Sequence, residues 1–516
     1  MACALATGAP RDAGAADAAP RLADSALAAV YAERANAPIW LAEDGARATA
    51  LLDALRAAED HALSARRYAP GRLESLLQAA QASGDPAAVT EAETAFTEAF
   101  LRYAADLGAG ALEPRRVSAD ILVEPPRRSA PLLLRAMAAA ENPAAHLAGL
   151  APADPGYAAL KRLFGDLRAK SGDAWGPPVA EGPSLREGDR GPRVAALRAR
   201  LEAMGDALAP SDAPAVYDGA LAAAVRAFQR RHGLNDDAVV GPLTLAALNV
   251  TPAARAAQVA VNMERMRWTN RPLDARRIDV NLADFSVTMW EDGAVRFHER
   301  AVVGMTSRQT PEFSDEMSYL VFNPTWHVPR SIAVRDLLPR LQADPAYLAR
   351  SNMRLIGTDA FPAPADPSSH DFNAYTARDF PYRIRQNPDP DNALGRVKFM
   401  FPNNLAIYLH DTPSQRLFAR DQRAYSSGCV RVRDPMTLAA LLLAPQMNAP
   451  EEFIERVLAS GRERYVNLDL RIPVHLTYRT AWIDDFGRPQ FRADVYGRDA
   501  LVLDALRALG VDAPET

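Results

Sequence analysis

The 516-residue sequence has few cysteines, no long apolar run and no excess of basic charge. Its two cysteines, Cys3 and Cys429, are too few for a disulfide scaffold or a cysteine-rich zinc site. No stretch of about 18 apolar residues is present, so we expect no segment to span a membrane. The 59 basic and 64 acidic side chains give a net charge of −5 without a long basic block, which argues against nucleic acid as the partner.

The beginning of the sequence does not identify a compartment. Residues 1–10 have neither the cationic segment nor the full apolar segment of a secretion signal. Two interpretations therefore stay open, a cytosolic protein and an exported protein whose leader is missing from this sequence. Cys3 is compatible with the remnant of a lipoprotein anchor, but only two residues precede it.

The N-terminal third has the periodicity of helices. Residues 1–20 are rich in Ala, Asp, Gly and Pro and are expected to form a flexible lead. Apolar residues then recur at helical spacing up to about residue 170, and turn-forming residues dominate 171–183. We predict an all-α scaffold domain over residues 21–183. Its expected helices lie near residues 51–58, 88–107, 131–140 and 157–169.

Residues 184–249 carry the pattern of three short helices. The motifs are L-x-x-G-D-x-G-x-x-V-x-x-L-x-x-x-L at 185–201, A-V-x-x-F-Q-x-x-x-G-L at 224–234 and V-G-P-x-T-x-x-A-L-N at 240–249. They resemble the peptidoglycan-binding type-1 module, which implies a possible glycan contact, while a generic three-helix spacer is the alternative. The module usually has Gly where this chain has Ala238, so we expect strain and a reshaped loop there.

In the C-terminal half, residues 250–516, the sequence pattern changes from one typical of helices to one typical of strands. After an expected helix at 253–268, apolar residues alternate with period two, first in residues 278–297. Further strands are expected within 399–409, 426–432 and 473–478, and helices near 437–443, 451–459 and 498–509. The proline-rich segment 336–392 interrupts this rhythm and is predicted to be an insertion that covers a cleft.

A cysteine and a histidine in two neighbouring motifs carry the expected chemistry. Tyr408-Leu-His-Asp-Thr-Pro413 is followed by Arg423-Ala-Tyr-Ser-Ser-Gly-Cys-Val-Arg-Val432. A thiol attacks acyl carbons as thiolate, and an imidazole can accept its proton and later return one to a leaving amine. Taken alone, a single cysteine is more often a buried apolar residue than a nucleophile. The surrounding motif therefore decides the interpretation.

That motif, with Asn-Pro-Thr-Trp-His-Val-Pro at 323–329, resembles the L,D-transpeptidase catalytic domain of the YkuD fold. The order of parts resembles the large Gram-negative subgroup, in which a helical scaffold and a glycan module precede the catalytic domain. The resemblance implies a multidomain α+β protein with a mostly β catalytic domain and a capping insertion.

The resemblance also implies roles for individual residues. Cys429 is the expected nucleophile, His410 the general base and then acid, and the main-chain carbonyl of Asp411 the partner of His410. The amides of Gly428 and Cys429, helped by Tyr408, are expected to form the oxyanion hole. No cofactor is implied.

A second set of residues is expected to bind substrate. Arg431 is expected to order the site or meet a substrate carboxylate, and Ser427, Trp326 and Arg423 are expected to line it, although Trp326 is equally typical of a core aromatic. Many members have His where this chain has Ser427. His327 and His370 are assigned to surface or lid positions without a metal, and Tyr425 to packing.

The implied reaction is peptidoglycan 3→3 cross-linking. The cysteine is acylated by a stem tetrapeptide at meso-diaminopimelate with release of D-Ala, and an amine of a neighbouring stem resolves the thioester. Alternatives are an L,D-carboxypeptidase or exchange activity, a hydrolase that detaches a bound lipoprotein, and a non-catalytic wall-binding scaffold on 184–249. A peptidoglycan substrate implies a periplasmic enzyme. The sequence indicates no oligomeric state.

Overall fold

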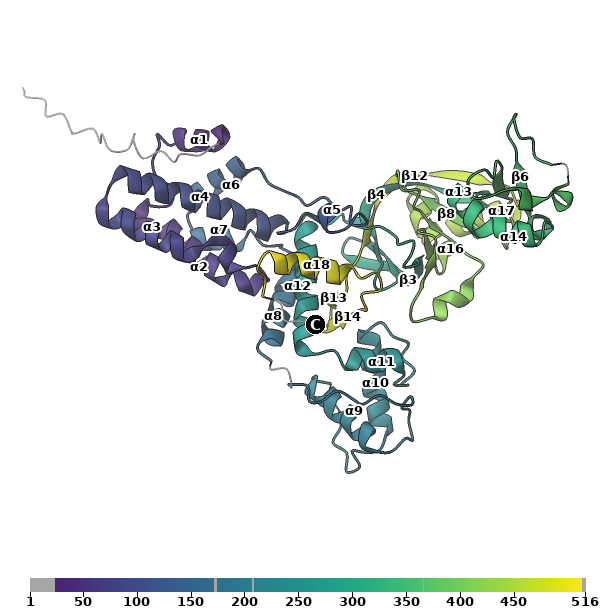
Figure 1. Ribbon diagram of the computed structural model, residues 1–516, viewed down its shortest axis with the longest axis horizontal. Coiled ribbons are helices and arrows are strands. Elements are labelled where there is room, and N and C mark those ends of the chain that lie inside the picture. Colours follow the sequence, from purple (N-terminus) through teal and green to yellow (C-terminus); the bar gives the residue numbers. More distant parts are fainter. Residues whose placement is uncertain (1–23, 171–173, 207, 365, 513–516) are drawn as a thin grey trace, which may run out of the picture. The chain divides into compact units, whose positions relative to one another are not determined.

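The computed structural model describes residues 24–170, 174–206, 208–364 and 366–512 (Figure 1). The chain forms two compact units. One contains the residues up to Pro272 together with those from Thr480 onward, and the other contains Leu273–Arg479. The first is predominantly helical and the second mostly β, which confirms the predicted α+β class. Among the described residues, no helix is both long and apolar enough to cross a bilayer.

The N-terminal part of the helical unit is an all-α scaffold. Its α-helices are α1 (Ser25–Ala32), α2 (Ala46–Arg56), α3 (Pro70–Ser83), α4 (Pro86–Ala109), α5 (Pro114–Val117), α6 (Ala130–Ala138), α7 (Pro143–Ala148) and α8 (Pro155–Arg168). The longest, α4, starts where the Asp85 side chain accepts a hydrogen bond from the Ala87 amide, with Pro86 in the first turn. All four helices expected in this region are present.

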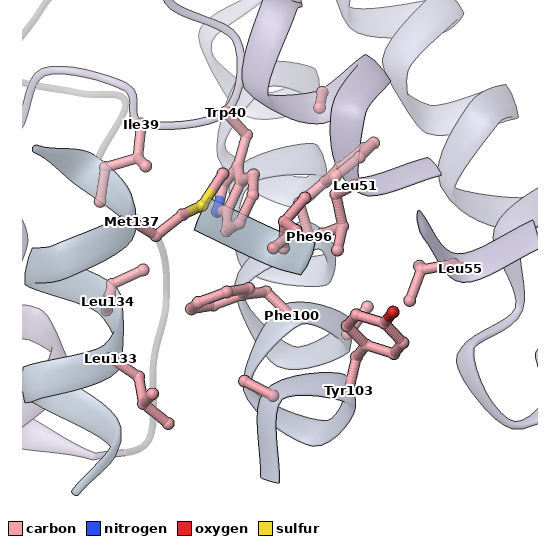
Figure 2. Close-up of a cluster of buried hydrophobic side chains, with 14 of the residues drawn as sticks. Ile39, Trp40, Leu51, Leu55, Phe96, Phe100, Tyr103, Leu133, Leu134 and Met137 are labelled. Carbon is pink, nitrogen blue, oxygen red and sulfur yellow. The ribbon is translucent and has the colours of Figure 1, made fainter. Parts of the chain in front are cut away.

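The scaffold core is built around Trp40 (Figure 2). Its ring centroid lies 6.0 Å from that of Phe96 and 5.3 Å from that of Phe100, and its Nε1 donates to Thr97 Oγ1 at 2.9 Å. The buried Glu93 carboxylate accepts the backbone amide of Trp40 and those of its two neighbours. The loop that delivers Trp40 is therefore fixed to α4 by both apolar packing and charge-assisted hydrogen bonds.

The three-helix segment also folds as predicted. Its helices are α9 (Pro192–Ala203), α10 (Gly219–Arg231) and α11 (Pro242–Leu248). The expected inward residues are buried, namely Val194, Leu197, Leu201, Ala224, Val225 and Phe228. Ala238 has φ 61°, so a side chain occupies a left-handed position that favours glycine. Its carbonyl accepts from Tyr217 Oη at 2.7 Å and its amide donates to Gln229 Oε1 at 2.9 Å, which hold that conformation.

Helix α12 (Pro252–Trp268) carries a buried ion pair that ties it to the scaffold. Arg267 Nη2 lies 2.7 Å from Glu264 Oε2, and both side chains have 0% exposure. Glu264 Oε1 also accepts from Leu112 N and Trp268 Nε1, each at 2.9 Å, and Arg267 Nη1 donates to Tyr157 Oη at 3.0 Å. These bonds satisfy the buried charges, which would otherwise be costly.

The C-terminal residues return to α12. The strands β13 (Ala481–Ile483) and β14 (Pro489–Phe491) form a hairpin, and α18 (Arg498–Ala508) packs on α12. Asn262 exchanges hydrogen bonds with Thr480, and Arg265 pairs with Asp499. The structure thus groups α12 and residues 480–512 with the helical unit, whereas the sequence-based range 250–516 combined them with the catalytic domain. The reason is this set of buried side-chain contacts, which the sequence pattern does not reveal.

The β unit is organised by one nine-stranded sheet of order β10-β3-β11-β9-β8-β4-β12-β1-β2. An additional pairing between β2 and β3 closes the sheet on itself. The strands are β1 (Arg276–Asn281), β2 (Ser286–Glu291), β3 (Ala294–Gly304), β4 (Phe313–Phe322), β8 (Val397–Met400), β9 (Leu409–His410), β10 (Ala424–Ser426), β11 (Val430–Val432) and β12 (Arg464–Thr477).

Two central strands are longer or more irregular than the sequence pattern predicted. β4 was not predicted, because Ser314, Asp315 and Glu316 interrupt its apolar alternation. β12 was predicted only over its last residues, because its register shifts between Asn467 and Ile472. The expected helices α16 (Pro435–Leu443) and α17 (Pro450–Ala459) are present and pack on each other.

The predicted insertion is a small subdomain with its own core. We call it the cap and define it as the described residues of 326–392. A three-stranded sheet of order β5-β7-β6 combines β5 (Trp326–His327), β6 (Met353–Ile356) and β7 (Arg383–Gln386). Between β5 and β6 lie α13 (Arg330–Ile332), a π-helical turn η4 (Ala333–Leu337), α14 (Leu338–Ala343) and α15 (Tyr347–Arg350). The cap begins about ten residues earlier than residue 336 because Trp326 pairs with Gln386.

We predict that the Glu264–Arg267 pair is essential for the stability of the helical unit. Glu264→Gln removes one charge of a fully buried pair and should destabilise this unit by about 3–5 kcal/mol. Hydrogen exchange of α8 and α12 in the intact chain measures the effect. Glu59→Gln, which removes a half-exposed partner of Arg168 at 3.6 Å, should change the stability of the helical unit by less than about 1 kcal/mol. Equal effects would contradict the prediction.

Candidate active site

Three neighbouring strands bring the expected catalytic residues to one face of the sheet. β9 lies between β8 and β11, with His410 paired to Lys398 on one side and to Arg431 on the other. Side chains of paired residues point to the same face, and so do those two positions apart. Tyr408 directly precedes β9, and its ring centroid lies 5.7 Å from that of His410. Cys429 directly precedes β11, and its side chain is hydrogen-bonded to that of Tyr408. Val430 N donates to Tyr408 O at 3.1 Å, which sets Cys429 beside Tyr408.

The intervening residues of these strands form the core. Leu409, Val430 and Phe399 each have 0% exposure. A register slip of one residue would turn the polar row toward the apolar core and these apolar side chains toward the face of the site, so the hydrophobic core fixes the catalytic register. The alternation of the sequence in this region thus has a direct chemical consequence.

His410 is held in one tautomer. Its Nδ1 lies 2.5 Å from the main-chain oxygen of Asp411, the contact expected from the sequence. Because a carbonyl oxygen only accepts, Nδ1 carries the proton and Nε2 has its lone pair free for another proton. The pKa of His410 is lowered to about 3, mainly because the ring is buried and secondly because Arg431 is positively charged. The imidazole is therefore neutral at neutral pH, with the Nε2 lone pair available to accept a proton.

Cys429 is a protonated thiol at rest. Its side chain is half-buried, and Sγ donates to the Ala406 carbonyl at 3.6 Å. Burial raises the pKa of Cys429 to about 11, against the opposing effects of hydrogen bonds from Tyr408 and of the charges on Lys398 and Arg431. The resting site is thus a neutral thiol and a neutral imidazole. Such a pair acts by general base catalysis during attack rather than through a preformed ion pair.

The loop that carries the nucleophile is shaped by hydrogen bonds. Gly428 has φ 123°, a conformation that L side chains rarely adopt. Ser426 Oγ accepts from Gly428 N at 3.1 Å and donates to Cys429 O at 2.5 Å. Thr310 is fully buried, and its Oγ1 donates to Gly428 O at 2.7 Å. The turn before Cys429 is therefore rigidly defined on both sides.

These bonds correct one expectation. The Gly428 amide was expected to donate in the oxyanion hole, but this N–H already donates to Ser426 Oγ. The Cys429 amide has no acceptor within the described part of the chain. The remaining expected donors are thus the Cys429 amide and the Tyr408 hydroxyl, whose pKa is raised by burial so that it stays protonated.

Two cations flank the thiol on the same face. Lys398 Nζ lies 4.8 Å from the centre of the Tyr408 ring, and burial lowers the pKa of Lys398. Burial also lowers the pKa of Arg431, whose Nε is buried without a hydrogen-bond partner within the described residues. An anionic group on the substrate would find a positive field here, which the charge of Glu463 offsets in part at Lys398.

The other predicted substrate residues have different surroundings. Ser427 is exposed beside Cys429. Trp326 belongs to the cap, where it packs against the cap core, so the structure favours its alternative as a packing residue. Arg423 is buried, and its guanidinium donates to the carbonyls of Ala301 and Phe285 among others, which corrects its expected substrate role to a structural one. Tyr425, expected to pack, is 43% exposed.

Two contributors were not found from the sequence. Asn403 accepts from the Leu405 and Ile407 amides and donates to the Phe401 and Ile407 carbonyls, and so shapes the loop that presents Ala406 to the thiol. Arg308 donates to Ser427 Oγ at 2.8 Å. The Pro-Asn-Asn sequence at 402–404 is a turn signal that would have indicated the first, whereas no local pattern indicates the second. Within the described residues, no cluster of His, Cys, Asp and Glu has the arrangement of a metal site.

Comparison with known families identifies the class of the β unit. Residues 275–456 match the model described as L,D-transpeptidase catalytic domain, YkuD. Residues 190–248 match a "Putative peptidoglycan binding domain" and residues 25–163 a "Scaffold domain". Residues 275–456 therefore match an L,D-transpeptidase catalytic domain, as the sequence motifs predicted.

One curated relative has a name of the same class. A curated protein of Haemophilus influenzae, named "Putative L,D-transpeptidase", is 38% identical over 242 residues, which are 47% of this chain and 48% of that protein. The match thus spans about half the length of the relative. Two solved structures of L,D-transpeptidases, from Xylanimonas cellulosilytica and Stackebrandtia nassauensis, are 17% and 13% identical and cover 58% of this chain and 100% and 97% of theirs. Their TM-scores are 0.18 and 0.23, too low to support an argument.

We predict a steep pH dependence for the reactivity of the free thiol. Because the pKa of Cys429 is raised to about 11, its thiolate fraction should grow about tenfold per pH unit between pH 7 and 10. The rate of iodoacetamide labelling at Cys429, followed by peptide mapping, should rise accordingly without a plateau. Mapping separates Cys429 from Cys3, and a free-cysteine peptide should level off near its pKa of about 8.5. A plateau below pH 8 would reveal a preformed thiolate and contradict this prediction.

Proposed function

We propose that this protein is a peptidoglycan L,D-transpeptidase that forms 3→3 cross-links through a thioester on Cys429. The observation that supports the proposal is the pairing of His410 with Arg431, two residues after Cys429, together with the orientation of His410 by the Asp411 carbonyl. The match of residues 275–456 to the catalytic domain supports the same class of reaction.

In the first step the stem tetrapeptide donates its acyl group. His410 Nε2 takes the Cys429 proton as Sγ attacks the carbonyl carbon of meso-diaminopimelate, so that an S–C bond forms and the carbonyl oxygen becomes an oxyanion. The Cys429 amide and the Tyr408 hydroxyl are the proposed donors to this oxyanion. Collapse breaks the C–N bond to the terminal D-Ala, and the imidazolium returns the proton to the leaving amine.

In the second step an amine from a neighbouring stem attacks the thioester. His410 accepts the proton of this amine as a new C–N bond forms, and returns it to the departing thiolate. The resting neutral pair is thereby regenerated. Arg431, and Lys398 on the same face, are proposed to attract a carboxylate of the stem peptide, because both cations flank His410 and Arg431 Nε is buried without a hydrogen-bond partner among the described residues.

The proposed substrate also suggests partners and a location. The match of residues 190–248 to a peptidoglycan-binding model supports a glycan contact by the three-helix module. Because peptidoglycan lies outside the cytoplasmic membrane, we propose that the protein acts in the periplasm. Exchange or hydrolysis of the same thioester is the competing activity. The cap favours transfer over hydrolysis if it shields the thioester from water.

A single incubation distinguishes these activities. The protein is incubated with disaccharide-tetrapeptide, and adducts and products are followed by mass spectrometry. We expect an acyl adduct on Cys429, release of D-Ala and a 3→3 dimer, all absent in Cys429→Ala. Tripeptide without dimer would assign the carboxypeptidase activity instead. Retained wall binding without any adduct would leave a binding scaffold.

Cys429 should also be acylated by carbapenems, whose β-lactam carbonyl is an acyl donor. Intact-mass spectrometry should show one adduct on the wild-type chain and none on Cys429→Ala. Cys429→Ser provides a matched control of nearly the same volume with a far weaker nucleophile. Adducts located at another residue would remove Cys429 from the mechanism.

Removal of His410 should slow acylation strongly. We expect His410→Ala to reduce the acylation rate by about 10²–10⁴-fold, the usual contribution of a general base, with the fold retained. His327→Ala is the matched control, because His327 is exposed on β5. Near wild-type acylation in His410→Ala would exclude His410 as the base.

A further inference from the structure

One guanidinium joins the cap to the loop of the nucleophile. Arg308 lies in the loop that follows β3, and its Nη1 donates to Ser427 Oγ at 2.8 Å. The same guanidinium grips the Asp336 carboxylate with two bonds, Nη1 to Oδ2 at 2.9 Å and Nη2 to Oδ1 at 3.0 Å. Two elements that are far apart in the sequence, the cap and the residue two positions before Cys429, thus share one side chain.

On the nucleophile side, the loop of Arg308 is firmly attached. Met305 N donates to Ser426 O at 2.9 Å, and Thr310 Oγ1 accepts from Gly304 N and donates to Gly428 O. The ends of the loop are therefore fixed to the same backbone that carries Cys429. A displacement of Arg308 would be transmitted to Ser427 directly and to Gly428 through Thr310.

On the cap side, Asp336 lies in the π-helical turn η4. Its neighbours Leu337 and Leu338 are buried in the cap core, so Asp336 moves only together with this part of the cap. Such π-helical turns are rare in proteins, and many of those that do occur lie at functional sites. Arg335 Nε lies 3.5 Å from Asp336 Oδ1, but Arg335 belongs to the cap itself, so this contact stays within the cap.

The contact has the geometry of a strong ion pair. It is bidentate, and the two side chains have only 17% and 31% exposure, so solvent screens it incompletely. The hydrogen bonds from Arg308 hold the pKa of Asp336 below its usual value, so the carboxylate remains charged at neutral pH. Arginine suits this position because its planar fork can bind a carboxylate and a hydroxyl at once.

We propose that Arg308 is a positioning residue that couples the cap to the nucleophile loop. When Asp336 engages Arg308, the guanidinium is oriented to hold Ser427, and with it the backbone of Gly428 and Cys429, in the arrangement for attack. Release of Asp336 frees the guanidinium and loosens the nucleophile loop. The catalytic consequence rests on the proposed function, whereas the mechanical coupling does not.

Hydrogen exchange in the intact chain tests the coupling. Asp336→Asn weakens the contact from the cap side and should accelerate exchange of the nucleophile loop, residues 424–432, by about fivefold or more. Ser427→Ala weakens the contact from the nucleophile side and should accelerate exchange of η4. Arg308→Met should accelerate exchange of both η4 and residues 424–432. The matched control is Arg350→Met, which breaks the Arg350–Asp344 ion pair inside the cap and should leave residues 424–432 unchanged. Changes confined to the segment that carries each substitution would overturn the coupling.

Turnover of the tetrapeptide donor tests the positioning role. Arg308→Met and Asp336→Asn should lower kcat about tenfold or more with little change in KM, and Arg308→Lys should restore part of kcat because it keeps the charge but not the fork. The double variant of Arg308 and Asp336 should be no slower than Arg308→Met alone. Wild-type kcat in both single variants would overturn the proposal. Coupled exchange in a wild-type chain that never acylates would instead refute the proposed function and leave the coupling intact.

Discussion

The contact between His410 Nδ1 and the main-chain oxygen of Asp411 is the constraint on which the site depends. A carbonyl partner fixes the tautomer without adding a charge, so the other ring nitrogen is a base in a row that also contains Lys398 and Arg431. Burial of the ring, and after it the charges of those cations, lower the pKa of His410, and burial raises the pKa of Cys429. Both groups are consequently neutral until substrate arrives. This arrangement limits the reaction of the free thiol with other electrophiles, because little thiolate is present at rest.

The sheet register makes this contact possible, and the core makes the register unique. His410 sits between Lys398 and Arg431 only because Leu409, Val430 and Phe399 point into the apolar interior. The catalytic row and the core are therefore alternate residues of the same short strands. Mutations that disturb the core of β8, β9 or β11 would move the chemistry even though they contact no substrate.

Much of this organisation could be predicted from the sequence, where the signals are local. Helical periodicity indicated the scaffold and three-helix module, and two short motifs indicated Cys429 and His410. Contacts between distant segments could not be predicted. Arg423 was misassigned because two of the carbonyls that bind it, those of Ala301 and Phe285, belong to residues 122 and 138 positions away, and Arg308 was missed because its partner Ser427 is 119 positions away. The engagement of the Gly428 amide by Ser426 was also invisible, since it depends on the shape of one turn.

The return of residues 480–512 to helix α12 has a consequence for biosynthesis. The β unit, Leu273–Arg479, is contiguous in the chain, whereas the helical unit is completed by segments that the ribosome makes more than two hundred residues apart. Asn262 and Arg265 thus remain without Thr480 and Asp499 while the entire β unit is translated. The helical unit therefore begins synthesis before the β unit but completes its packing after it, and a chain that ended after the β unit would have an open helical core.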